Sequence, residues 1–486
     1  MKRWTMLIDS YSGLEKKAVN MLSGFFSGYL NYVLPVKYAD KVSEDELKAN
    51  NVIFVGKETS PFISSDCRIK QLVDVPKLAE AYAVFVGESI YDPENQMIII
   101  SGFDEAGVLY GCMDFCNKYC GDILYKNEDI WGKEIFSDPF GKKINDWSIS
   151  LFPAIKHRAI WTWGHVIYDY RSFFENMARL KLNEIVIWND RAPLNASDVV
   201  EYAHSLGIKV IFGFAWGWGL SCSDIIEKYN EEEKLKLKES VIRTYETEYL
   251  DSCCDGIYFQ SFTELNKDYI NGKCIAELVT ELVNDIAGAL LSKYPGLHIQ
   301  FGLHATSVKK HLDFISKVDE RVHIVWEDCG AFPYSYWADQ ISDYDETCSL
   351  SDKLLSLRGN NERFGAVFKG MLKLDWNEFE HFDNSYILGE RTENYINSRQ
   401  QTKNRIWKIQ QASWIENANY FRKIIALIAN KGNDCIVQGL VEDSMFENKI
   451  MLPVAIFAEM MWTPNEDTNK LIGQVSKYPC VHFANI

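Results

Sequence analysis

The stretch Asp255–Leu265, with the sequence DGIYFQSFTEL, decides how the rest of the chain is interpreted. Its apolar first half predicts a buried strand, and polar residues including Glu264 follow at once. A buried strand that ends in a carboxylate is how a parallel barrel builds an active site. Other apolar segments repeat this form, since each is short, follows a helical pattern and stops at Trp, His, Asp or Glu. We therefore predict a parallel barrel with its site at the strand ends.

From about residue 156 onward, strand-like and helix-like patterns alternate in regular order. Such alternation is typical of βα units and of a parallel sheet, and eight units close as an α/β (β/α)8 TIM barrel. We assign residues 151–486 to this catalytic barrel, with a helical insertion at about 391–431 that packs outside it. The eight predicted strands are 158–163, 184–188, 209–214, 256–259, 298–302, 322–326, 365–370 and 435–440.

Residues 1–150 also alternate strand-like and helix-like patterns, and they predict a small α/β domain in front of the barrel. Two of its strands, at about 82–86 and 96–101, are separated by the polar turn Asp92–Asn95. No Gly-rich phosphate loop or catalytic cluster stands out, so we assign this part to support of the barrel. With 486 residues, 47% of them hydrophobic, the chain is long enough for both units.

Composition argues against several classes of partner. The formal net charge is −17, whereas a nucleic-acid partner would need a clustered basic surface. No apolar run reaches the ~20 residues of a membrane span, and the first residues lack the apolar segment of a signal peptide. We expect a cytoplasmic protein with no nucleic-acid or membrane partner, although a chain whose leader had been removed would show the same start.

Twelve cysteines raise the question of a metal site or of disulfides. Cys112, Cys116 and Cys120 share one stripe of a predicted amphipathic helix, where thiols usually pack as small core residues. The sequence has no paired Cys-x-x-Cys framework for zinc. We expect core packing and reduced thiols, with no metal and no cofactor.

The C-terminal ends of the predicted strands carry Trp, His, amides and charged side chains. Aromatic faces stack on the apolar face of a pyranose ring while polar groups bind its hydroxyls, so this mixture suits an oligosaccharide or glycoside substrate. A single Trp is more often a core residue, but six at one end of the barrel favour a binding site. The candidate substrate-binding residues are Arg158, Trp161, Trp163, His165, Trp188, Asn189, Asp190, Trp216, Trp218, Gln260, His304, Trp326 and Lys369.

Glycoside hydrolysis needs one carboxylic acid to protonate the leaving oxygen and usually a second carboxylate to act as nucleophile or to activate water. Glu264 after the fourth strand is the candidate general acid, and Glu327 or Asp328 after the sixth is the candidate partner. Glu264 has a structural alternative, a salt bridge to Lys267 or Lys369. The cations Lys369 and Arg158 either bind a carboxylate-bearing sugar or neutralise the acidic strand ends.

The chain resembles a group of glycoside hydrolases that includes family 20 hexosaminidases and family 67 α-glucuronidases, with family 84 more distant. Residues 102–113, GFDEAGVLYGCM, resemble the start of the last helix of the family 20 amino-terminal domain. The segment Lys156-His-Arg-Ala resembles the Arg-Gly that opens the barrel, which implies that Arg158 binds the terminal sugar. Asp255–Glu264 falls where these families carry their general acid.

The departures from these families bear on mechanism. Family 20 places an Asp before its acid Glu, but Thr263 precedes Glu264, which puts substrate-assisted chemistry in doubt. The layout of Glu327, Asp328 and Asp375 resembles family 67 and favours inversion. We expect an exo-acting glycoside hydrolase of the β-N-acetylhexosaminidase type. The alternatives are an inverting α-glucuronidase-like enzyme and a non-catalytic carbohydrate-binding relative, and the sequence leaves the sugar and the oligomeric state open.

Overall fold

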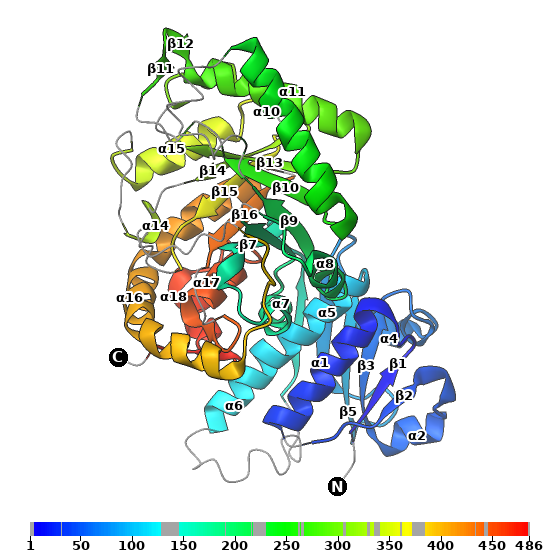
Figure 1. The fold of residues 1–486 in the computed structure, drawn as a ribbon. Coiled ribbons are helices and arrows are strands. Elements are labelled where there is room, and N and C mark those ends of the chain that lie inside the picture. Colours follow the sequence, from blue (N-terminus) through cyan, green and yellow to red (C-terminus); the bar gives the residue numbers. More distant parts are fainter. Residues whose placement is uncertain are drawn as a thin grey trace.

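The computed structural model describes most of the chain (Figure 1). The described residues are 4–484, apart from residues 31, 128–144, 190, 215, 217–229, 261–262, 264–266, 305–307, 328–330, 335–340, 360–361, 372–383, 433 and 442–445.

The first part of the chain forms a six-stranded mixed sheet. Four strands run parallel in the order β2 (Val36–Tyr38), β1 (Trp4–Ile8), β3 (Asn51–Lys57) and β5 (Gln96–Gly102). β4 (Tyr82–Glu88) pairs antiparallel with β5 and with the edge strand β6 (Trp147–Leu151). The turn signal at Asp92–Asn95 therefore does join two neighbouring antiparallel strands.

Helices cover both faces of this sheet. Helix α1 (Gly13–Tyr29) and helix α5 (Glu105–Asp114) lie between the sheet and the barrel (Figure 1). The helix continues from α5 through a π-helical turn at Phe115–Cys120 into α6 (Gly121–Asn127), and Cys112, Cys116 and Cys120 are buried free thiols on it. The short helices α2 (Glu44–Ala49), α3 (Pro61–Ser64) and α4 (Cys67–Leu72) pack on the opposite face.

The remainder forms a closed barrel of eight parallel strands, which confirms the predicted TIM barrel. Each predicted strand is found within about two residues of its expected position, because buried parallel strands leave short continuous apolar runs in the sequence. β16 pairs with β7 and closes the barrel. The strands are β7 (His157–Trp163), β8 (Glu184–Trp188), β9 (Lys209–Gly213), β10 (Gly256–Gln260), β13 (His298–His304), β14 (His323–Glu327), β15 (Phe364–Phe368) and β16 (Ile436–Leu440).

Helices surround the barrel, and the longest, α16 (Glu393–Lys431), lies between β15 and β16 in sequence. It buries Trp407, Trp414 and Phe421 against the barrel's outer layer. None of the helices in the described ranges combines the length and apolar character needed to cross a lipid bilayer. The other α-helices in the described part of the barrel are α7 (Tyr170–Arg179), α8 (Ala196–His204), α10 (Glu231–Thr244), α11 (Ile275–Lys293), α13 (Leu312–Ile315), α14 (Ala331–Tyr334), α15 (Tyr344–Leu354), α17 (Leu452–Met460) and α18 (Thr468–Val475).

Alternation along the strands decides which side chains enter the barrel. On β7, Trp161 and Trp163 face the interior, whereas Ile160 packs outward against the helices. One apolar cluster fills the barrel, and a second, larger one lies between the strands and their helices. The inner cluster consists of Trp161, Trp163, Val166, Val186, Trp188, Ile211, Tyr258, Val325, Val367 and Leu440.

Four buried charges join the sheet to the barrel. Lys118 contacts Asp114 at 2.7 Å and Glu459 of α17 at 2.6 Å. Lys181, which follows α7, contacts the same two carboxylates at 2.7 and 3.2 Å. Two acids and two bases compensate one another, so the boundary between the two units is held by paired charges as well as by apolar packing.

Candidate active site at the C-terminal end of the barrel

Glu327, the last residue of β14, collects side chains from three other strands at the C-terminal end of the barrel. Tyr258 Oη and Gln260 Nε2 of β10 both donate to its Oε1. Its Oε2 lies 3.2 Å from His304 Nε2 at the end of β13 and 2.9 Å from Lys369 Nζ just after β15. The Glu327 side chain is only 1% exposed. These five residues, Tyr258, Gln260, His304, Glu327 and Lys369, are called the Glu327 cluster below.

Strand register explains why these side chains meet. His304 stands opposite Glu327 in the β13–β14 pair, and both face the interior. Gly302 lies one interior position earlier on β13, where an added Cβ would collide with the Tyr258 hydroxyl. The missing side chain leaves the space through which Tyr258 reaches across β13 to Glu327.

The electrostatics of the Glu327 cluster hold Glu327 in its charged form. Burial alone would raise the pKa of the Glu327 carboxyl, but Lys369 and His304 outweigh it and hold this pKa well below its usual value. Glu327 is therefore a carboxylate at neutral pH and cannot serve as a proton donor. With four donors on two oxygens, it also fixes the positions of Lys369, His304 and Gln260.

Aromatic rings line the barrel interior next to this carboxylate. Trp161 packs edge-to-face on Trp163, with ring centroids 5.0 Å apart, and lies 6.1 Å from Trp188. Tyr258 contacts both Trp161 and Trp188 and so joins the rings to the Glu327 cluster. No side chain in the part of the chain that the structure describes accepts a hydrogen bond from the buried Nε1–H of Trp161.

Two further predicted residues lie near these rings. His165 belongs to a short 3-10 turn at Gly164–Val166, and its ring centroid is 6.4 Å from that of Trp163. Asn189 follows β8 directly and is buried, with its backbone N–H donating to the carbonyl of Gly213. Both lie at the C-terminal end of the barrel, where the sequence analysis placed them.

The structure does not bring Trp216 and Trp326 to this site. Trp326 precedes Glu327 on β14, so the two-residue period sends it to the opposite side of the strand. Trp216 is fully buried and stacks on Phe259 with ring centroids 3.4 Å apart. Both indoles belong to the apolar layer between strands and helices. Their role is packing, because neither faces the barrel interior.

Arg158 is also separate from the site. Its side chain leaves the second residue of β7 outward and forms an ion pair of 2.6 Å with Glu80 of the sheet unit. Its guanidinium also donates to the backbone carbonyls of Ile155, Lys156 and Lys181. Arg158 therefore joins the barrel to the sheet unit, and the sugar contact implied by the family resemblance has no support from its position.

Four predicted site residues, Glu264, Asp328, Asp190 and Trp218, lie outside the described residues, as does Asp375. Among the described residues, sequence analysis missed Tyr258 because it considered only side chains at strand ends. Tyr258 lies two residues before Gln260 on the same strand, so both face the barrel interior, and this two-residue spacing could have identified Tyr258 from the sequence.

No family model and no curated protein matches the sequence. Solved structures with some likeness include the protein titled CpGH84D, with a TM-score of 0.44 and 12% identity over 75% of this chain. The match spans 57% of the CpGH84D chain. The catalytic domain of a chitinase from Pyrococcus furiosus gives a TM-score of 0.33 and 9% identity, covering 64% of this chain and 98% of its own. A Parabacteroides merdae β-glucuronidase gives 0.32 and 9%, covering 63% and 36%. All three TM-scores are below 0.5, so these likenesses carry no argument about activity.

Proposed function

We propose that the protein is an exo-acting glycoside hydrolase of the β-N-acetylhexosaminidase type. The observation that carries the proposal is the buried, ionised Glu327, which lies beside a Trp-lined interior at the end where parallel barrels carry their catalytic groups. A fixed negative charge there stabilises the positive charge that develops on a sugar ring as its glycosidic bond breaks.

In the proposed mechanism, Glu264 is the general acid and protonates the leaving-group oxygen. Glu327, whose oxygens already accept from four donors and whose pKa is depressed, supplies a fixed negative charge, and Asp328 activates the water that attacks the anomeric carbon. We assign the contacts with sugar hydroxyls to His304 and Gln260, which Glu327 holds in place at this end of the barrel. The missing Asp before Glu264 favours direct attack by water, and so inversion, over participation by an acetamido group.

The α-glucuronidase alternative needs a cation for the sugar carboxylate. Both cations predicted for this task are engaged, since Lys369 pairs with Glu327 and Arg158 pairs with Glu80. This observation favours an uncharged sugar. A non-catalytic carbohydrate-binding protein would share the Trp-lined interior, and turnover separates it from an enzyme.

The decisive experiment compares wild type with Glu264→Gln on a panel of nitrophenyl glycosides and on unactivated disaccharides of the sugars that react. Gln keeps the shape of Glu but has no proton to donate. We expect hydrolysis of the unactivated disaccharide to fall by roughly 10²- to 10⁴-fold, with a smaller loss for nitrophenyl leaving groups.

The control is Glu277→Gln, which changes an exposed glutamate at the start of α11 and should leave both rates unchanged. Equal rates for wild type and Glu264→Gln on the disaccharide would show that Glu264 is not the acid. Sugar binding by the wild type without turnover of any glycoside would favour the binding-protein alternative.

A further inference from the structure

A second polar cluster lies at the N-terminal end of the barrel, opposite the Glu327 cluster. It consists of His157 at the start of β7, Glu184 at the start of β8, His298 at the start of β13, His323 at the start of β14 and Asp434 just before β16. These five residues are called the histidine cluster. The proposed hydrolysis does not use any of them.

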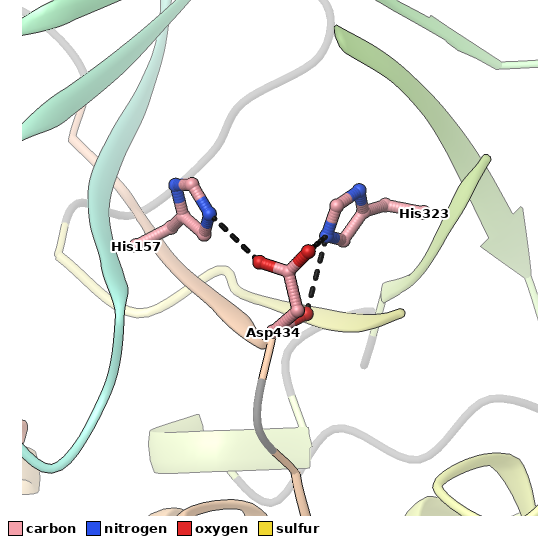
Figure 2. Close-up of side chains that lie close together, drawn as sticks. All are labelled: His157, His323 and Asp434. Atoms are coloured by element: carbon pink, nitrogen blue, oxygen red, sulfur yellow. Dashed lines mark hydrogen bonds and ion pairs between the residues drawn. The ribbon is translucent and has the colours of Figure 1, made fainter. Parts of the chain in front are cut away.

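Three of these side chains converge on one point. His157 Nε2 lies 3.1 Å from Asp434 Oδ1, and His323 Nε2 lies 3.8 Å from Asp434 Oδ2. The ligand atoms of all three residues lie within 4.8 Å of one another. Figure 2 shows the two imidazole rings on either side of the Asp434 carboxylate, each with a nitrogen directed toward it. Ligands about 2 Å from a tetrahedral zinc ion stand about 3.3 Å apart, so shifts of about 1 Å bring the three to coordination distance.

The far nitrogen of each ring has a partner that orients it. His157 Nδ1 lies 3.1 Å from Glu184 Oε2, and His323 Nδ1 lies 2.8 Å from His298 Nε2. His298 Nδ1 is in turn 3.9 Å from the same Glu184 oxygen. Metal-binding histidines usually donate their second N–H to such a partner, which leaves the lone pair of the other nitrogen for the metal.

The His323 ring has two tautomers that fit its contacts: with the proton on Nε2 it donates to the backbone carbonyl of Asp434, 3.1 Å away, and with the proton on Nδ1 it donates to His298. The second tautomer is the one that a metal ion would select, because it leaves the Nε2 lone pair for the metal. In this arrangement, Nδ1–H of His157 donates to Glu184, and Nδ1–H of His323 donates to His298, whose own Nδ1–H faces Glu184. The Nε2 lone pairs of His157 and His323 are then both directed toward the Asp434 carboxylate. A lone pair facing a carboxylate is repulsive unless a cation or a proton lies between them. Two imidazoles and one carboxylate are the donor set that suits Zn²⁺ and other divalent transition metals.

We propose that His157, His323 and Asp434 bind a divalent transition-metal ion of the Zn²⁺ class, with Glu184 and His298 as outer partners. The ion joins the first, sixth and eighth strands of the barrel, including the β16–β7 pair that closes it. Because the Glu327 cluster lies at the other end, the ion stabilises the fold and takes no part in hydrolysis.

Access to this site depends on Lys156. Its Nζ lies 2.7 Å from Asp434 Oδ1, and Arg363 Nε lies 3.4 Å from Oδ2, so two cations compete with the metal for the carboxylate. The Lys156 side chain is 57% exposed and that of Asp434 is 25% exposed. Lys156 can therefore swing into solvent, and Asp434 can be reached from outside. Removal of Lys156 should strengthen metal binding if the metal and Lys156 compete for Asp434. If Lys156 and Asp434 form only a structural ion pair, its removal should not increase metal affinity.

The test uses the full chain, stripped of metal with a chelator and titrated with Zn²⁺ by calorimetry, with Co²⁺ absorption as a second probe. Wild type should bind one equivalent and melt at a higher temperature when loaded. Asp434→Asn should weaken binding by more than the roughly 10- to 100-fold that loss of an outer partner costs. Lys156→Met should tighten it by about fivefold.

Asp352→Asn is the control, because Asp352 is an exposed partner of Lys431 elsewhere on the surface and should leave the zinc affinity unchanged. No binding by wild type, equal affinity in Asp434→Asn, or weaker affinity in Lys156→Met would each overturn the proposal. Lys156→Met changes an exposed side chain, so it decides the matter even if Asp434→Asn does not fold. Glycosidase activity should be the same with and without chelator, so failure of this site and failure of the proposed hydrolase function are read from separate measurements.

Discussion

The two ends of the barrel interior carry different chemistry on the same strands. At the C-terminal end, β14 presents Glu327 to a lysine, a histidine, an amide and a phenol beside three indoles. At the N-terminal end, the same strand presents His323 to two histidines and an aspartate. Aromatic faces beside a fixed anion suit a sugar, whereas convergent imidazoles suit a metal ion.

The two ends also differ in how deeply their lysine–carboxylate pairs are buried. The Lys369–Glu327 pair is almost enclosed, whereas the Lys156–Asp434 pair has a lysine that is mostly in water. An enclosed pair whose partner is removed leaves an uncompensated charge, but an exposed pair gains little over hydration. A lysine–carboxylate pair therefore contributes differently to stability at the two ends of one barrel.

Removal of the lysine at each end tests this difference and should give the largest effect on stability. Lys369→Met leaves Glu327 buried without its main counter-charge and should lower the free energy of unfolding by about 3–5 kcal/mol. Lys156→Met should lower it by no more than about 1 kcal/mol. Denaturant unfolding of both metal-free variants measures the two values, and equal losses would contradict the assignment of Lys369–Glu327 as the buried pair.

The pH dependence of stability sharpens the account of the C-terminal end. The folded-state pKa of Glu327 is depressed because Lys369 and His304 outweigh the effect of burial, whereas an unfolded Glu titrates near about 4.3. Its contribution to stability is therefore fully present above that pH and is lost as pH falls toward the folded pKa. The difference in unfolding free energy between wild type and Glu327→Gln should shrink as the pH falls below about 4.

Glu277→Gln, which changes an exposed glutamate, is the control for this comparison. If the gap between wild type and Glu327→Gln instead widened on acidification, Glu327 would be protonated in the folded protein at neutral pH, and its assigned role as an anion would be wrong.

The smallest expected effect concerns the interior indoles. Trp163→Phe keeps an aromatic ring but reduces the stacking face, and should cost about 1 kcal/mol of sugar affinity in the Glu264→Gln background, where turnover is slow. Trp216→Phe alters an outward-facing ring and should change stability without changing sugar affinity. Calorimetric titration with the sugar measures the affinity of each variant. The same loss of affinity in both variants would show that interior and outward-facing indoles do not differ in their contribution to sugar binding.

Sequence patterns predicted the barrel well because each strand is a short apolar run bounded by polar residues. They predicted Glu327, His304 and Lys369 at one end of the barrel because the C-terminal ends of parallel strands meet there. They misplaced Trp216 and Trp326, since proximity to a strand end was considered without the side on which the residue lies. The histidine cluster was not found, because its members stand at strand starts separated by up to 277 residues, as between His157 and Asp434.

The four buried charges Asp114, Lys118, Lys181 and Glu459 bear on whether the sheet unit and the barrel can be separated or joined to other proteins. A barrel expressed without the preceding sheet would lose two of these four charges, and Arg158 would lose Glu80. Each remaining buried charge would then lose an ion-pair partner, which is strongly destabilising. The junction is therefore a poor place for grafting one unit onto a foreign partner, and we expect sheet and barrel to have been inherited as a pair.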